Sequence, residues 1–234
     1  METIEIISLM LGAAWASGIN LYAAVLVLGY LGNAGHVELP PGLELLGDPL
    51  VMLAAGSMYV VEFFADKIPG IDTGWDALQT FVRIPAGALM AAGAAQGLDV
   101  GQAAEFAALL LGGGIATASH ATKAGSRMLI NTSPEPFSNF GASVAEDVSV
   151  VAGLWAALNH PWVFIGLFVV FVILVIWLLP KIWQALRSAA ARVRRWFGTN
   201  APPADTATPS SAPPVPDPAA VPAPDKRLPE RPSR

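Results

Sequence analysis

The chain has 234 residues, of which 54% are hydrophobic and only 13% are charged. Soluble domains carry about 25% charged residues, and here the mean hydropathy is +0.53. These values argue against a soluble enzyme, a nucleic-acid-binding protein and a disordered protein, and they favour a multi-spanning membrane protein. The chain contains 0 cysteines, which excludes disulfides, thiolate metal sites, iron–sulfur clusters and cysteine nucleophiles.

The net charge of −5 hides an asymmetry along the chain. Residues 1–180 contain 14 acidic and four basic residues, whereas residues 181–234 contain four acidic and nine basic residues. The larger part is therefore acidic, and a basic face for a polynucleotide is not expected, so no nucleic-acid partner is predicted.

Six apolar runs approach the ~20 residues that a helix needs to cross a bilayer. Asp48 and Pro49 are typical of a helix start, and so is Asp72 as an N-cap. The third helix should kink near Pro85, and Pro180 should end the sixth. We therefore predict an all-α membrane protein with six transmembrane helices, over residues 6–31, 49–65, 72–97, 104–122, 139–158 and 162–179.

Three regions follow from this pattern. Residues 1–183 form the polytopic helical domain, and residues 184–198 form a basic, partly amphipathic helix that is expected to lie along anionic lipids after Pro180. Residues 199–234 are rich in proline and poor in large apolar side chains, so we expect a disordered tail. Docking of a partner on its prolines is the alternative.

Positive residues gather on the cytoplasmic side of membrane proteins. Six spans with a cytoplasmic C-terminus place the N-terminus in the cytoplasm as well. Loops 66–81 and 123–138 are then cytoplasmic, and loops 32–48, 98–103 and 159–161, which hold acidic residues but no Lys or Arg, face outward. The predicted location is the inner (plasma) membrane of a bacterium, and the N-terminal residues lack the basic region of a cleaved signal peptide.

The two halves of the chain also suggest an inverted repeat of three helices each. At an offset of 100 residues, segment 11–20 lies over segment 111–120, which makes Asn20 and His120 equivalent. Pairs of acids occupy the second helix of each half. A 3+3 inverted repeat is therefore a hypothesis, with the substrate site expected at the interface between the repeats.

Polar groups at membrane depth are costly, at roughly 2.5–3.5 kcal/mol for a charge at the helix centre. The functional interpretation is a charged cavity in which acids bind a cation or relay protons, with Glu62 and Asp147 preferred for coupling. The structural interpretation is that the charges pair to hold the bundle, while Lys67 and Lys123 reach the interface. The candidate substrate- or ion-binding residues are Asn20, Glu62, Asp66, Arg83, His120, Lys123, Arg127, Glu146 and Asp147.

Several of these residues lie in motifs that resemble a bacterial membrane-protein family catalogued as domain of unknown function 4126. The resemblance covers about residues 8–180 and implies a polytopic membrane protein, but no activity. It rests on Gly18-Ile19-Asn20-Leu21-Tyr22, on residues 62–72 with Trp75-Asp76, on residues 83–88, on His120 with Lys123 and Arg127, on residues 133–139, and on Glu146-Asp147.

The function expected from the sequence is transport, by a transporter or channel, of a small solute, ion or lipid headgroup, with proton coupling as one form. The alternatives are a lipid-modifying enzyme that holds a phosphate on Arg83, Lys123 and Arg127, and a scaffold that acts through its tail. An enzyme is less favoured, because no nucleophile has a base at suitable spacing. No cofactor or metal is expected, since two of the three histidines fall in outer loops. Faces of small residues are compatible with a homodimer.

Overall fold

The computed structural model describes all residues except 69, 99–100, 132–135 and 198–234, and the described residues contain helices and no strand. The chain divides into one unit of residues 1–193 and a second of residues 194–234. Only the first is discussed below. Its elements are α1 (Thr3–Asn33), the 3-10 helix η1 (Pro41–Gly47), α2 (Pro49–Ala65), α3 (Ile71–Ala95), α4 (Gln102–Ile130), α5 (Pro136–Asn159) and α6 (Pro161–Phe197).

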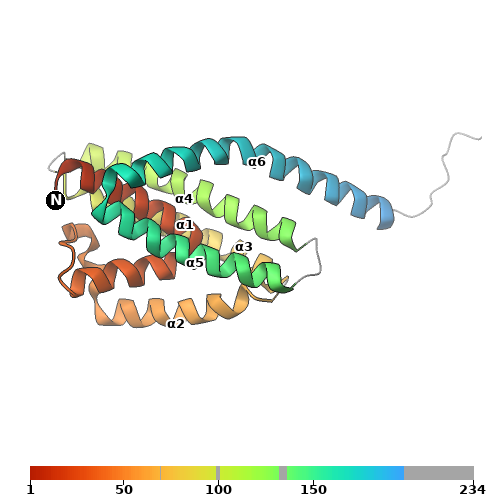
Figure 1. Ribbon diagram of the computed structural model, residues 1–234, viewed down its shortest axis with the longest axis horizontal. Coiled ribbons are helices and arrows are strands. Elements are labelled where there is room, and N and C mark those ends of the chain that lie inside the picture. Colours follow the sequence, from red (N-terminus) through yellow and green to blue (C-terminus); the bar gives the residue numbers. More distant parts are fainter. Residues whose placement is uncertain (69, 99–100, 132–135, 198–234) are drawn as a thin grey trace, which may run out of the picture. The chain divides into compact units, whose positions relative to one another are not determined.

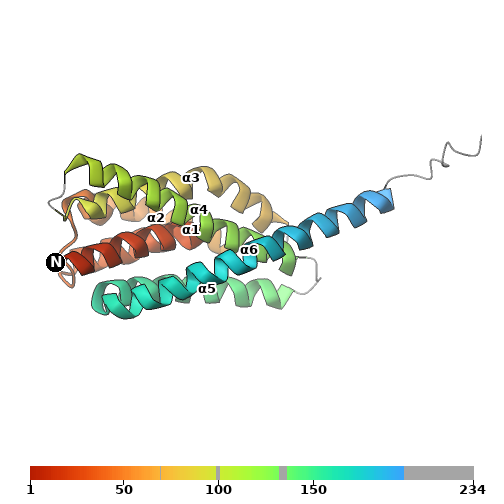
Figure 2. The ribbon, with the colours of Figure 1, turned by 90° about the horizontal axis from the view of Figure 1, so that it is seen from above.

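Helix α1 is a hairpin and not a straight helix. Asn20 has the non-helical angles φ −146° and ψ 94°, and the chain turns back there (Figures 1 and 2). The Cδ1 atom of Ile6 and the Cγ atom of Pro40 lie 3.0 and 3.3 Å from the position that a Cβ atom on Gly97 would occupy. In a straight helix of 1.5 Å per residue, Ile6 would be about 40 Å from Asn33. Residues 6–31 therefore form two antiparallel arms and not the one straight helix that the sequence predicts.

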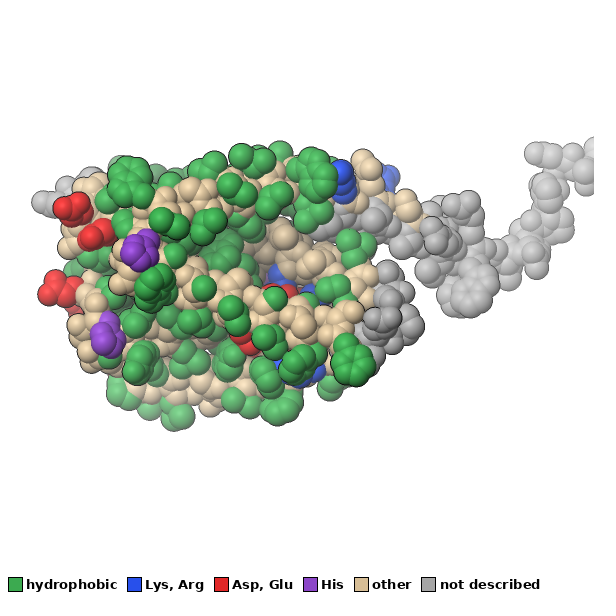
Figure 3. Space-filling view, in the orientation of Figure 1, with side chains coloured by type: hydrophobic (Ala, Val, Ile, Leu, Met, Phe, Trp, Pro, Cys, Tyr) green, Lys and Arg blue, Asp and Glu red, His purple; other side chains and the backbone are tan. Residues whose placement is uncertain are grey.

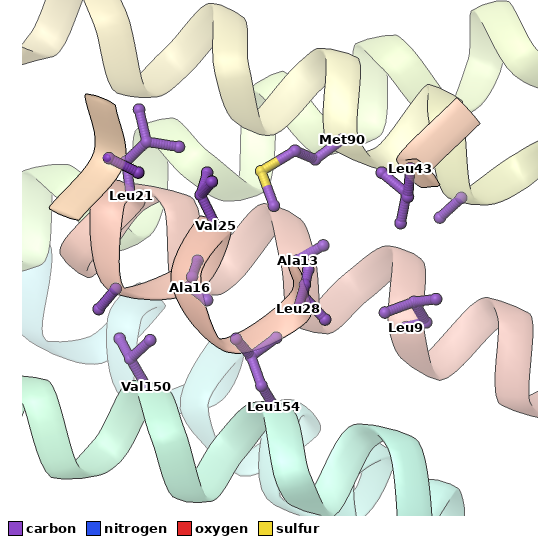
Figure 4. Packing of buried hydrophobic residues seen from close by; sticks show 14 residues of the cluster. Leu9, Ala13, Ala16, Leu21, Val25, Leu28, Leu43, Met90, Val150 and Leu154 are labelled. Atoms are coloured by element: carbon purple, nitrogen blue, oxygen red, sulfur yellow. The ribbon is translucent and has the colours of Figure 1, made fainter. Parts of the chain in front are cut away.

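The two arms of the hairpin pack inside the bundle. Leu9 and Ala13 of the first arm and Val25 and Leu28 of the returning arm belong to one buried apolar cluster (Figure 4). Small residues and aliphatic side chains let the arms approach each other and α5, whose Leu154 joins the same cluster. Because the arms start and finish at the same end, the N-terminus lies at the end that also carries residues 34–48.

Helices α2, α3, α4, α5 and α6 run alternately between the two ends of the bundle (Figures 1 and 2). The predicted bounds of α2 are confirmed. Its N-cap is Asp48, whose Oδ1 atom accepts hydrogen bonds from the backbone N–H groups of Leu50 at 2.7 Å and Val51 at 3.3 Å. Pro49 at the first helical position needs no such partner.

Several predicted helix ends differ from those in the structure. Helix α3 is capped by Gly70, with φ +90°, and not by Asp72, which lies inside the first turn. Helix α4 continues to Ile130, so residues 123–130 are helical and not part of a loop. Helix α6 runs through Pro180 to Phe197. A proline removes one backbone hydrogen bond, but the long helical segments on both sides keep the helix continuous.

The distribution of side chains is that of a protein with an apolar outer surface. Among the described residues, three helices are long and apolar enough to cross a membrane, namely Thr3–Asn33, Phe137–Asn159 and Pro161–Lys181, and η1 with α2 would form a fourth such span bent by 65°. Of these, α1 has the length but folds back. Hydrophobic side chains cover the outer faces of the bundle (Figure 3), among them Leu53, Phe64, Phe81, Leu167 and Trp177. The charged side chains of α3 and α4 are instead largely buried.

Candidate functional site

Lys123 of α4 lies at the centre of a group of buried charges. Its Nζ atom is 3.1 Å from Glu62 Oε1, 3.1 Å from Asp66 Oδ2, 3.3 Å from Glu146 Oε2 and 3.8 Å from Asp76 Oδ1. The lysine side chain is only 2% exposed. The interpretation that Lys123 reaches the interface is therefore wrong, because its ammonium group is held by carboxylates from three other helices or their ends.

Two buried arginines extend this group on either side of Lys123. Arg83 of α3 pairs with Glu62 and, over 3.4 Å, with Asp76. Arg127 pairs with Glu146 over 2.8 Å and with Asp66 over 3.4 Å. We call these seven residues the charge cluster: Glu62, Asp66, Asp76, Arg83, Lys123, Arg127 and Glu146.

Helical spacing explains why these residues meet. Glu62 and Asp66 are four residues apart, as are Lys123 and Arg127, and residues at this spacing share a helix face. Asp76 precedes Arg83 by seven residues, which is about two turns. Three helix faces therefore each present two charges toward the middle of the bundle, and Glu146 of α5 completes the set.

The charge cluster has more acidic than basic side chains. It combines four carboxylates with three cationic side chains, and the buried atoms Glu62 Oε2, Asp66 Oδ1 and Asp76 Oδ2 have no hydrogen-bond partner. The ammonium group of Lys123 has three N–H donors, and all of them face carboxylates. A buried carboxylate oxygen without a donor is costly, so the cluster is suited to take up a proton or another cationic or hydrogen-bond-donating species.

Asp66 is the member of the charge cluster that follows the end of α2. Burial raises the pKa of its carboxyl group, and the attraction of the nearby Lys123 does not offset this effect. The pKa of Asp66 therefore lies above the ordinary range for an aspartate.

The donors of the arginines are almost all occupied. Arg127 uses Nε and Nη2 on Glu146 and Nη1 on the backbone carbonyls of Asp66 and Asn139. Among the described residues of the charge cluster, the buried donor without a partner is Arg83 Nε. A phosphate group needs several free donors, so the arrangement does not favour the predicted alternative of a lipid phosphate held by Arg83, Lys123 and Arg127.

The tip of the α1 hairpin lies next to the charge cluster. Asn20 donates from Nδ2 to Asp147 Oδ1 at 2.8 Å, and the hydroxyl of Tyr59 donates to Asp147 Oδ2 at 2.9 Å. Ser17 donates to the backbone carbonyl of Arg83 at 2.9 Å. Asp147 also faces the N-terminal end of the returning arm, whose dipole favours a negative charge.

His120 connects α4 to α3 beside the charge cluster. Its Nδ1 atom is 3.3 Å from Arg83 Nη1, and its Nε2 atom is 2.8 Å from Thr80 Oγ1 and 3.1 Å from the carbonyl of Asp76. Because a guanidinium group only donates, Nδ1 is the acceptor and the ring proton is on Nε2. Within the part of the chain that the structure describes, no three His, Asp or Glu side chains are arranged to hold a metal ion.

The structure thus brings seven of the nine predicted site residues together as the charge cluster and His120, while Asn20 and Asp147 form an adjoining pair. The equivalence of Asn20 and His120 within an inverted repeat stays a prediction. In the structure the two positions differ, because Asn20 breaks a helix and His120 lies within a continuous one. The prediction missed Asp76, although its spacing of two turns before Arg83 was a usable signal. It also missed the polar partners Tyr59, Thr80, Asn131 and Asn139.

A second polar group lies where α3 begins and α4 ends. The Nδ2 atom of Asn131 donates to the carboxylate of Asp72 at 2.7 and 2.9 Å, and Asn139 donates to Asn131 Oδ1 at 2.8 Å. The backbone N–H of Gly70 also donates to Asp72 at 2.8 Å. These bonds fix the end of the bundle nearest the charge cluster, so their role is to hold α3, α4 and α5 in place.

Comparison with known proteins gives one result. Residues 7–181 match the family described as "Domain of unknown function (DUF4126)". No curated protein and no solved structure matches the chain. The matched region contains α2 to α5, nearly all of α1 and the apolar part of α6, and thus every residue of the charge cluster. The chain belongs to the family of domain of unknown function 4126.

Proposed function

We propose that this chain is a proton-coupled transporter of the bacterial inner membrane, with the charge cluster as its proton-binding site. The observation that carries the proposal is the excess of acids in the charge cluster, four carboxylates against three cationic side chains, with three buried carboxylate oxygens that have no hydrogen-bond partner. Ionisable residues inside a membrane domain commonly mark proton relays and ion pathways. A broken helix with its tip at mid-bundle is also a recurrent feature of transporter sites.

The proposed orientation follows from the hairpin and from the charges at the two ends. Lys67 and Lys181 mark the end where α2 finishes and α6 emerges, and that end should be cytoplasmic. Glu38, Glu44 and Asp48 mark the opposite end, which also carries the N-terminus. The C-terminus is then cytoplasmic and the N-terminus is outside, in contrast to the orientation expected from six straight spans.

The experiment measures charge displacement after a pH jump on a supported membrane that carries proteoliposomes with the full-length protein. Protonation of the cluster should give a transient current in the wild type that protein-free vesicles lack. Glu62→Gln and Asp76→Asn should each reduce this current about tenfold or more, because each removes a buried proton acceptor. Glu105→Gln, on α4 but outside the cluster, is the matched control and should keep the wild-type current.

Substitutions at a buried ion pair can destabilise a protein by about 3–5 kcal/mol. Each variant is therefore also checked for a monodisperse elution profile and a cooperative thermal transition. Absence of a current in folded wild-type protein would rule the proposal out. Wild-type currents in folded Glu62→Gln and Asp76→Asn would also contradict it.

A further inference from the structure

A groove separates α6 from α4 and α5, and its lining is mostly apolar with a small polar floor. The whole groove has a volume of about 260 Å³, and its polar lining residues are Ser119, Thr122, Lys123, Ser126, Glu146 and Ser149. Figure 3 shows charged side chains at the bottom of a hollow between bands of apolar side chains. We call this volume the lateral groove. It gives the charge cluster an opening on the side of the bundle.

The hydroxyl groups of the lateral groove present acceptors and not donors. Ser119 donates to the carbonyl of Ile115 at 3.0 Å, Thr122 to Ala118 at 2.8 Å, Ser126 to Lys123 at 2.8 Å and Ser149 to Glu146 at 2.7 Å. A hydroxyl has one proton. Because that proton is hydrogen-bonded to a backbone carbonyl of the same helix, only the lone pairs of the hydroxyl oxygen remain for a ligand.

The charged residues of the lateral groove also offer a ligand acceptors and not donors. The N–H donors of Lys123 face Glu62, Asp66 and Glu146. The side chain of Glu146 is 16% exposed, whereas the other acids of the charge cluster are at most 4% exposed. A ligand in the groove therefore meets a carboxylate and several hydroxyl oxygens, which complement a cationic group that bears N–H donors.

Two apolar cavities share lining residues with the lateral groove. One, of about 250 Å³, lies against Trp15, Gly153 and Phe164, and the other, of about 330 Å³, lies between α4 and α6. Phe171 of α6 lines all three volumes. An apolar ligand body can thus extend from the polar floor without leaving the groove, and a cation at the floor lies near an aromatic ring, a favourable arrangement.

We propose that the lateral groove binds an amphiphilic ammonium compound, with a primary or secondary ammonium group on the floor and its apolar body along Phe171. This inference rests on the proposed function, because it names the substrate class of the same transporter. The ammonium group competes with a proton for the carboxylate of Glu146, the most exposed acid of the charge cluster. The apolar outer faces of the neighbouring helices allow the ligand to arrive from the bilayer.

The test measures binding of radiolabelled dodecylammonium to full-length protein in nanodiscs, with empty nanodiscs as background. We expect saturable binding at one site per chain. Dodecyltrimethylammonium, which is cationic but has no N–H donor, should compete about tenfold more weakly or worse, and dodecyl sulfate should not compete. Glu146→Gln should weaken binding about tenfold.

Two neighbouring exposed residues of α5 provide a test variant and a matched control for general effects on folding. Ala145 lines the groove, so Ala145→Phe should fill it and abolish binding. Val144 is 40% exposed, and Val144→Phe should bind as the wild type does. Absence of saturable binding, equal competition by dodecyl sulfate, or unchanged binding by Ala145→Phe would overturn the inference.

The two proposals can fail separately. Saturable binding of dodecylammonium without charge displacement after a pH jump would reject proton coupling and leave the groove as a binding site. Charge displacement without saturable binding would reject the amphiphilic ligand and leave the proton site.

Discussion

Asn20 and Asp147 are 127 residues apart in the sequence, yet the side-chain amide of Asn20 donates to Oδ1 of Asp147 at 2.8 Å. The carbonyl oxygen of the same side chain accepts from the backbone N–H of Ala23 at 3.0 Å. One residue therefore ends the first arm of the α1 hairpin, caps the returning arm and supplies a donor to an acid of α5.

Asn20→Ala should destabilise the protein by about 1–3 kcal/mol, since it removes a helix cap and leaves a carboxylate oxygen with one donor fewer. The measurement is the thermal transition in detergent. Asn159→Ala is the control, because exposed Asn159 bonds only within its own helix, to Trp155. An equal change in the thermal transition of both variants would contradict a specific stabilising role for Asn20 at the tip of the hairpin.

The hairpin predicts that residue 2 and residue 44 are on the same side of the membrane. The chain has no native cysteine, so Glu2→Cys, Glu44→Cys and Ile68→Cys can each be labelled with a membrane-impermeant maleimide in oriented vesicles. Glu2→Cys and Glu44→Cys should react from one side and Ile68→Cys from the other. If Glu2→Cys instead reacts together with Ile68→Cys, the first segment crosses the membrane.

Gly18 lies at a point of close approach between the hairpin and α4. A Cβ atom at this position would lie 1.8 Å from Ser119 Oγ and 2.5 Å from the carbonyl oxygen of Ala116. Gly18→Ala should therefore destabilise the protein by about 1–3 kcal/mol through overpacking. Gly114→Ala, in α4 with nothing within 4 Å, should be neutral or stabilising by up to about 1 kcal/mol. Similar thermal transitions for the two variants would contradict the close approach.

Asp66 predicts a pH dependence with a definite sign. Because burial raises the pKa of Asp66 in the folded protein, its stabilising contribution is complete below the ordinary aspartate pKa of 3.8. That contribution is lost as the pH rises through the raised pKa. The loss of stability caused by Asp66→Asn should then be largest near pH ~4 and smaller near pH ~8. Thermal transitions across this range test it, with Glu38→Gln as control, and a difference that grows with pH would contradict it.

Local signals predicted the helices well where the cap was unambiguous. Asp48 followed by Pro49 gave α2 with its observed ends, because the side chain of Asp48 and the fixed φ of proline act within one turn. The charged residues of the site were also recognisable, since each lies in a largely apolar context. What the sequence did not show was the end of α4: Lys123 and Arg127 suggested a loop, but their ion pairs with other helices make the buried helical position favourable.

The hairpin could not be predicted from length and hydrophobicity. Residues 6–31 are apolar throughout and long enough to cross a bilayer, and the turn depends on contacts of Ser17, Gly18 and Asn20 with residues far along the chain. The polar residues in the middle of the run were visible, but a helix in lipid tolerates them equally when a neighbouring helix accepts their hydrogen bonds. Tertiary contacts decided between a span and a hairpin.

The partners of the hairpin tip also bear on how the protein is made. Ser17 bonds to Arg83, Gly18 packs against Ser119, and Asn20 bonds to Asp147. Each of these partners leaves the ribosome after the hairpin itself has been synthesised. The hairpin is therefore translated before the residues that satisfy its tip, and it reaches all of its native contacts only after α5 has been synthesised.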